Sequence, residues 1–181
     1  NLTHNYRWLK TCARYFKKTD YFFVSFGWAL TPHLCDQASW MFEYLKLNKE
    51  QFFLLYNTPE EKSRGEKAGF TGAVINNNAW LNSDQLSLKK CNKIYDACYI
   101  ARAVKFKRHE LCATIDNLAL AAGDSCSGSE GGTLPPCKND PSKFLNRDEI
   151  SQLCAQSHCG LIFSEIEGAC YASSEYLLCG I

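Results

Sequence analysis

Residues 83–123 read SDQLSLKKCNKIYDACYIARAVKFKRHELCATIDNLALAAG, and this stretch decides the predicted fold. Ser83 is a typical helix N-cap residue. After it, apolar positions recur at helical spacing: Leu88, Cys91, Tyr95, Cys98, and Ala101 or Arg102. The pattern predicts a long helix over 84–104, followed by a second helix over 109–122 that stops at Gly123. We expect these two helices to form the scaffold.

Shorter elements are predicted on both sides of this scaffold. The predicted helices cover 5–18 and 36–47, and further helix starts are marked by Asn48, Thr58 and Asn146. The predicted strands are a buried aromatic run over 21–30, at most one short strand within 69–82, and a C-terminal pair over 161–167 and 171–178. The predicted fold class is mainly α with a minor β component (α+β), a disulfide-stapled helical domain with a short C-terminal hairpin.

Residues 124–142 differ in composition from their surroundings, because glycine, proline and serine crowd together there. Such a stretch predicts a long surface loop. The 39 residues after it are few for an independent core. We therefore expect residues 1–181 to form a single domain, with a sub-boundary in loop 124–142 as the alternative.

The cysteines dominate the prediction of cellular location. The 11 cysteines, all disulfide candidates, are Cys12, Cys35, Cys91, Cys98, Cys112, Cys126, Cys137, Cys154, Cys159, Cys170 and Cys179. No Cys-x-x-Cys pair occurs, so the spacing favours disulfides over a zinc site, and no metal is predicted. Cys91 and Cys98 lie seven apart in a predicted helix, a rise of about 10 Å, so they cannot bond to each other. An odd count leaves one thiol over, which keeps a disulfide-linked oligomer open.

Disulfides imply a secreted protein or the extracellular face of a membrane. The sequon Asn1-Leu2-Thr3 agrees with this location and makes Asn1 a predicted glycosylation site. No secretory signal opens the chain, so we expect it to have been removed or left off. No stretch approaches the roughly 18 unbroken apolar residues of a membrane helix, so no membrane span is predicted.

A basic helix face is the one candidate binding surface. Its residues, Arg7, Lys10, Arg14 and Lys17, fall opposite Leu9 and Phe16 in the first predicted helix. Such a stripe could hold a sulfated glycan, a phospholipid headgroup or an acidic partner, or could be an ordinary solvated face. A second basic run, 105–109, has the same two interpretations. The formal net charge of +1 and the lack of a binding motif argue against nucleic acid.

No motif of a known catalytic class is present, so no catalytic residue and no cofactor are predicted. Three functions stay open. The first is a non-enzymatic binding module that recognises a protein or glycan partner. The second is a carrier whose aromatic residues, crowded within 21–56, enclose a lipid or a small apolar ligand. The third is a secreted hydrolase of unrecognised type.

Overall fold

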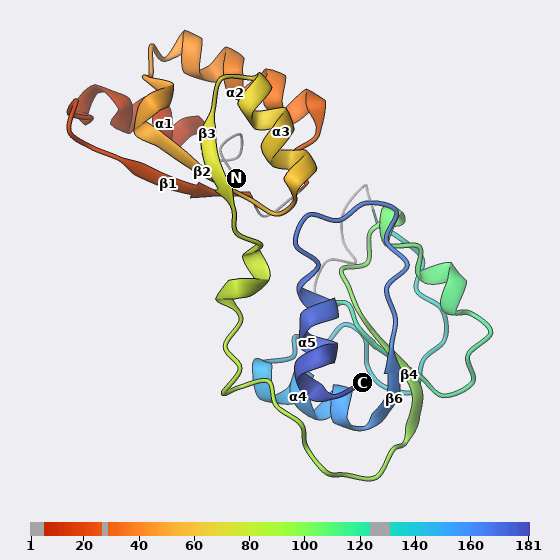
Figure 1. Ribbon diagram of the computed structural model, residues 1–181. Coiled ribbons are helices and arrows are strands. Elements are labelled where there is room, and N and C mark those ends of the chain that lie inside the picture. The colour runs from red at the N-terminus through yellow and green to blue at the C-terminus, as the bar shows by residue number, and fades with distance from the viewer. Residues whose placement is uncertain (1–5, 27–28, 124–130) are drawn as a thin grey trace. The chain divides into compact units, whose positions relative to one another are not determined.

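The computed structural model describes residues 6–26, 29–123 and 131–181. The chain forms two compact units (Figure 1). Unit 1 comprises Asn1–Trp80 with Glu167–Ala169, and unit 2 comprises Leu81–Ile166 with Cys170–Ile181. The protein is 39% helical and 17% strand, and each unit is built on a three-stranded parallel sheet.

Unit 1 alternates strands and helices. Its strands are β1 (Phe22–Ser25), β2 (Phe52–Tyr56) and β3 (Thr71–Val74), paired in the order β1-β2-β3. The crossover helices are α2 (Pro32–Tyr44) and α3 (Pro59–Lys67), and they follow α1 (Tyr6–Cys12) and the 3₁₀ turn η1 (Ala13–Tyr15). The remaining 3₁₀ turns are η2 (Lys49–Gln51) and η3 (Asn77–Trp80). Both crossover helices begin with proline after a threonine cap, which presets the first helical turn.

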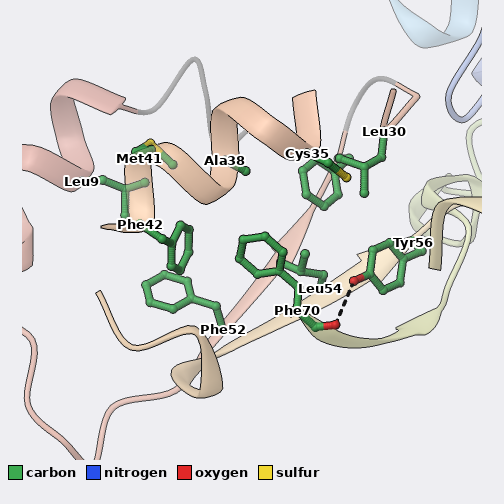
Figure 2. Close-up of a cluster of buried hydrophobic side chains, with 11 residues drawn as sticks. Leu9, Leu30, Cys35, Ala38, Met41, Phe42, Phe52, Leu54, Tyr56 and Phe70 are labelled. Carbon is green, nitrogen blue, oxygen red and sulfur yellow. Dashed lines mark hydrogen bonds between the residues drawn. The ribbon is translucent and has the colours of Figure 1, made fainter. Parts of the chain in front are cut away.

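One face of the unit 1 sheet carries the core (Figure 2). Phe42 of α2 packs its ring edge-on against Phe52 and Phe70, at 4.7 and 5.0 Å between ring centroids. Gly65 of α3 lies against Tyr56, so close that any side chain there would overlap the ring. Both helices therefore cover the same face, as right-handed crossovers require when each new strand is added on the same side.

Unit 2 has a different strand order. Its strands are β4 (Tyr95–Ile100), β5 (Leu118–Ala121) and β6 (Ser157–Gly160), paired as β5-β4-β6. Two 3₁₀ turns, η4 (Lys105–Lys107) and η5 (His109–Cys112), connect β4 to β5, while α4 (Arg147–Ala155) precedes β6 and α5 (Tyr171–Cys179) follows it.

Both faces of this second sheet are covered. Cys98 and Ala119 pack with α4 and α5 on one face, and Tyr99 and Leu120 pack with Cys112 of η5 on the other. The connection after β4 leads to β5 on one side of β4, and the connection after β5 leads back past β4 to β6 on the other side. Because both crossovers are right-handed, they lie on opposite faces of the sheet. Parallel sheets are normally buried on both sides in this way.

The prediction of a mainly α, disulfide-stapled helical domain is wrong, because the protein is mixed α/β. The predicted helix 84–104 contains β4, the predicted helix 109–122 ends in β5, and the predicted strand 171–178 lies in α5. Strands buried on both faces are continuous apolar runs, which periodicity alone does not distinguish from buried helix. β1 and β3 and the starts of α3 and α4 lie where the sequence placed them. α2 overlaps the predicted helix 36–47 but begins four residues earlier, and the helix start predicted at Asn48 is wrong, because only a 3₁₀ turn follows it before β2.

The disulfide prediction is also wrong. No two cysteines of the described residues lie at disulfide distance, and Cys126 lies outside those residues, as does the sequon at Asn1. Cys35 lies in the core of unit 1, and Cys112 lies on one face of the unit 2 sheet. Cys98, Cys154 and Cys179 pack in one cluster on the other face of that sheet without forming a disulfide. The expectation of a secreted, extracellular protein rested on disulfides and conflicts with this finding.

The thiols are expected to react with a chromogenic disulfide reagent in two groups. Cys91 and Cys159 are exposed and should react in the native protein. The buried thiols, Cys35, Cys98, Cys112, Cys154 and Cys179, should react only after unfolding. Burial also raises the pKa of Cys112 to about 11, which leaves little of the reactive thiolate at neutral pH. A thiol count that stays low in denaturant without a reductant would contradict the absence of disulfides.

Candidate functional site

The carboxyl ends of β4 and β6 define the candidate site, which lies within unit 2. β4 is central, and its neighbours β5 and β6 are reached by connections on opposite faces of the sheet. The loops that follow β4 and β6 therefore start from the same edge of the sheet. In open parallel sheets small molecules bind at such a switch point, beside the carboxyl ends of the strands.

The loop after β4 is strongly basic. It carries four cationic side chains within seven residues, Arg102, Lys105, Lys107 and Arg108, and no acidic residue until Glu110. Arg102 and Lys105 are exposed, and Lys107 and Arg108 are half-buried. Arg108 has φ 50° and ψ 48°, a left-handed conformation that costs a non-glycine residue about 1 kcal/mol. Such backbone strain is typical of functional sites.

Hydrogen bonds tie the loop after β4 to the loop after β6. The Tyr99 hydroxyl donates to the Lys107 carbonyl at 2.6 Å and accepts from the Phe163 amide at 3.4 Å. Arg108 Nε donates to the Phe163 carbonyl at 2.6 Å, and the Glu165 amide donates to the Phe106 carbonyl at 3.0 Å. These bonds hold the basic loop in one conformation, so its cations are arranged before any ligand arrives.

The buried side chain of His109 packs beneath the same loop and bonds to its first residue. Its side chain is 1% exposed, its ring lies 4.7 Å from the Tyr99 ring, and Nε2 lies 3.3 Å from the Ala101 carbonyl oxygen. Because that carbonyl only accepts, Nε2 carries the proton and Nδ1 is left as an acceptor. Nδ1 has no hydrogen-bond partner among the described residues. Burial lowers the pKa of His109 below its ordinary value of 6.5.

Stability is expected to fall at mildly acidic pH because of His109. The unfolded chain binds a proton on this residue below pH 6.5, whereas the folded chain resists it, so folding stability decreases as the pH falls through this range. Urea unfolding at pH 7 and at about pH 5 measures the loss. The variant His109→Gln should show a smaller loss than the wild-type protein, and equal losses in the two proteins would contradict the assignment.

An ion pair joins the helices that flank β6. Glu175 of α5 is buried and pairs with Arg147, the first residue of α4. In strand-helix-strand units the helix before a strand starts at the carboxyl edge of the sheet, so this pair stabilises the same edge. The α4 N-terminus itself is closed by a capping box between Asn146 and Glu149.

The corresponding edge of unit 1 is occupied by its own polar network. Glu61 accepts from the Leu30 and Asn57 amides at 2.9 and 2.8 Å. The Asn57 side chain donates to the Phe26 carbonyl and accepts from the Asn77 amide. The network links the chain after all three strands, and unit 1 has no switch point because both crossovers cover one face. These polar groups therefore serve the fold of unit 1.

The basic helix face predicted from the sequence lies elsewhere, in unit 1. Arg7 and Lys10 lie on α1, Arg14 lies on η1, Lys17 follows it, and all four side chains are exposed in unit 1. The basic run 105–109 was noted in the sequence, but as a connection between two helices. An apolar run that ends at Ala101 and is followed by cations would have indicated a strand with an anion-binding loop. Because residues 84–104 were predicted as one helix, this pattern did not lead to the prediction of a strand and a binding loop.

The fold and this edge define the protein as an α/β protein whose second unit has a doubly wound parallel sheet. No protein family, no curated protein and no solved structure matches the chain. Within the described residues, no group of three or more His, Cys, Asp or Glu side chains is placed to hold a metal ion. The same residues include no helix long and apolar enough to cross a bilayer.

Proposed function

We propose that unit 2 binds a phosphorylated small molecule of the nucleotide class at the carboxyl edge of β4 and β6. The observation that carries the proposal is the coincidence of the switch point with the four cations of the loop after β4. The topology supports the place of binding, and the charge supports the chemistry of the ligand.

The side chains at the edge suit a phosphate group. Arg102 offers a planar fork that bonds two phosphate oxygens, and Lys105 offers a compact point charge. Both side chains are exposed, and the Arg108 Nε donates to the Phe163 carbonyl. Glu165, on the loop after β6, is exposed and adds a carboxylate that can accept from ligand hydroxyls, as acidic residues do for ribose in doubly wound folds.

The three functions predicted from the sequence remain predictions. A protein or glycan partner is compatible with the exposed cations of unit 1. The carrier hypothesis needed the aromatic residues of 21–56 to enclose a ligand, but Phe42 and Phe52 are core residues, while Phe23, Trp40 and Tyr44 are exposed. Nucleotide binding by unit 2 requires neither disulfides nor secretion.

Titration calorimetry with the full chain tests the proposal. The probes are the nucleoside diphosphates, the matching nucleosides and inorganic pyrophosphate. We expect the diphosphates to bind and the nucleosides to bind far more weakly. The double variant Arg102→Gln/Lys105→Gln should weaken diphosphate binding by at least roughly a hundredfold, since each bond to a charged group contributes about 1.5–3 kcal/mol.

A matched control uses two lysines of unit 2 outside this edge. Lys89 and Lys90 precede β4, at the opposite end of the strand. The variant Lys89→Gln/Lys90→Gln removes the same charge and should bind diphosphates as the wild-type protein does. Equal losses in the two double variants would show a general charge effect and contradict the proposed site, as would the absence of binding by any phosphorylated probe.

A further inference from the structure

A basic and aromatic surface lies at the start of unit 1, within residues 6–21. It has five cationic side chains, Arg7, Lys10, Arg14, Lys17 and Lys18, and all five are exposed. The same stretch contains a single acidic residue, Asp20, which accepts a hydrogen bond from the Lys17 amide at 2.8 Å. This surface is therefore a dense positive patch in a chain whose formal net charge is only +1.

Large aromatic side chains are exposed in the same stretch. Trp8 is 52% exposed, Tyr15 is 65% exposed and Tyr21 is 72% exposed. These side chains are surplus to the core, which takes Leu9 and the half-buried Phe16 from this segment instead. Exposed aromatic side chains that gather beside charged residues in one short stretch are typical of an interaction surface.

The segment holds cations and aromatic rings in adjoining positions. Leu9 is 1% exposed and fixes the inward side of α1. Arg7 and Lys10 lie three residues apart on α1, which places them along one flank, and Arg14 follows in η1. Trp8 contacts the Phe16 ring at 5.9 Å, and the Arg14 guanidinium lies 4.8 Å from the centre of the Tyr15 ring. Because Leu9 and Phe16 pack into the core, the cationic and the aromatic side chains of this segment face the solvent.

We propose that this surface docks unit 1 onto an anionic phospholipid bilayer. Clusters of four to eight Lys and Arg residues bind the phosphate and carboxylate headgroups of anionic lipids, and Trp and Tyr favour the boundary between headgroups and acyl chains. α1 has only seven residues, so docking occurs through side chains that enter the headgroup layer. The described residues contain no membrane-spanning helix, and the proposed attachment is peripheral and reversible.

The aromatic side chains favour a bilayer over a sulfated glycan. Either partner satisfies the cations, because sulfate and phospholipid headgroups are both anionic. A bilayer also takes up the apolar parts of Trp8, Tyr15 and Tyr21. Sulfated glycan binding depends on charge alone here, so the two partners differ in their response to loss of the aromatic rings.

Co-sedimentation of the full chain with lipid vesicles tests the proposal. We expect binding to vesicles of equimolar phosphatidylcholine and phosphatidylserine, weaker binding at high salt, and little binding to pure phosphatidylcholine. The variant Arg7→Gln/Lys10→Gln/Arg14→Gln/Lys17→Gln should lower partitioning by about a hundredfold or more, since each cation contributes about 1 kcal/mol. The variant Trp8→Ser/Tyr15→Ser should lower it without any change in charge.

Controls separate this surface from charge in general and from misfolding. Four exposed lysines elsewhere, Lys46, Lys67, Lys90 and Lys138, give a quadruple glutamine variant of equal charge that should bind vesicles nearly as the wild-type protein does. Circular dichroism checks that each variant is folded. The proposal fails if the two quadruple variants lose binding equally, or if the chain binds heparin, unchanged by Trp8→Ser/Tyr15→Ser, and does not bind anionic vesicles.

Discussion

Replacing Glu61 by alanine is expected to lower the free energy of unfolding of unit 1 by about 2–6 kcal/mol, because two buried amides lose their acceptor at about 1–3 kcal/mol each. Those amides belong to Leu30 and Asn57, and Glu61 itself is 4% exposed. A domain of ordinary stability has about 5–15 kcal/mol in total. The substitution therefore removes a large part of what holds the loops after β1 and β2 together.

Tryptophan fluorescence during urea unfolding measures this effect selectively. All four tryptophans lie within residues 1–80, so the signal reports on unit 1. Glu66→Ala is the matched control, because Glu66 lies on the same helix, is exposed and pairs with Lys62 at 3.7 Å, a surface contact expected to contribute about 0.5 kcal/mol or less. If both variants unfolded at the same urea concentration, the network at this edge would have no special role in stability.

Replacing Gly160 by alanine is expected to destabilise unit 2 by about 2–5 kcal/mol, through overpacking and lost hydrogen bonds. A Cβ atom on Gly160 would lie 2.3 Å from the first ring carbon of Tyr176, whose side chain is buried. The Tyr176 hydroxyl accepts from the Ile100 amide at 2.9 Å and donates to the Leu161 carbonyl at 3.2 Å. A displaced ring would lose both bonds at the carboxyl ends of β4 and β6.

Hydrogen exchange of the amides in β4 and β6 measures this effect, while tryptophan fluorescence should report an unchanged unit 1. Diphosphate binding should weaken with it, because the loops of the proposed site leave from these strand ends. Tyr176→Leu removes the ring that the new Cβ atom would overlap. The double variant Gly160→Ala/Tyr176→Leu should therefore be more stable than the sum of the single effects predicts. Additive losses would contradict the overlap between Gly160 and Tyr176.

Helix starts and the first strand could be predicted because their causes are local. The Thr58 side chain accepts from the Glu61 amide and Pro59 begins α3, so the whole signal lies within four residues. The capping box of Asn146 and Glu149 is equally local and marks α4 correctly. In both places the sequence pattern and the backbone hydrogen bonds involve the same few residues.

The strands of unit 2 could not be predicted in this way. Ala97 pairs with Leu118, and Ala97 also pairs with Cys159, so the bonds that make β4 a strand come from residues far along the chain. The local pattern of Leu88, Cys91, Tyr95 and Cys98 matches helical spacing, but Leu88 and Cys91 are exposed and precede β4, and only Tyr95 and Cys98 lie in the strand. The candidate site depends on those strands, so it was missed with them.

The sequence by itself determined the helix caps, the aromatic strand β1 and the exposed cations of α1 and η1, because neighbouring residues decide these features. Only the tertiary structure decided the rest: the parallel sheets, the burial of thiols without disulfides, and the meeting of the loops after β4 and β6. The physical reason is the range of the interactions. A cap is one hydrogen bond within a turn, whereas a parallel ladder, a disulfide or a shared edge joins residues that come together only on folding.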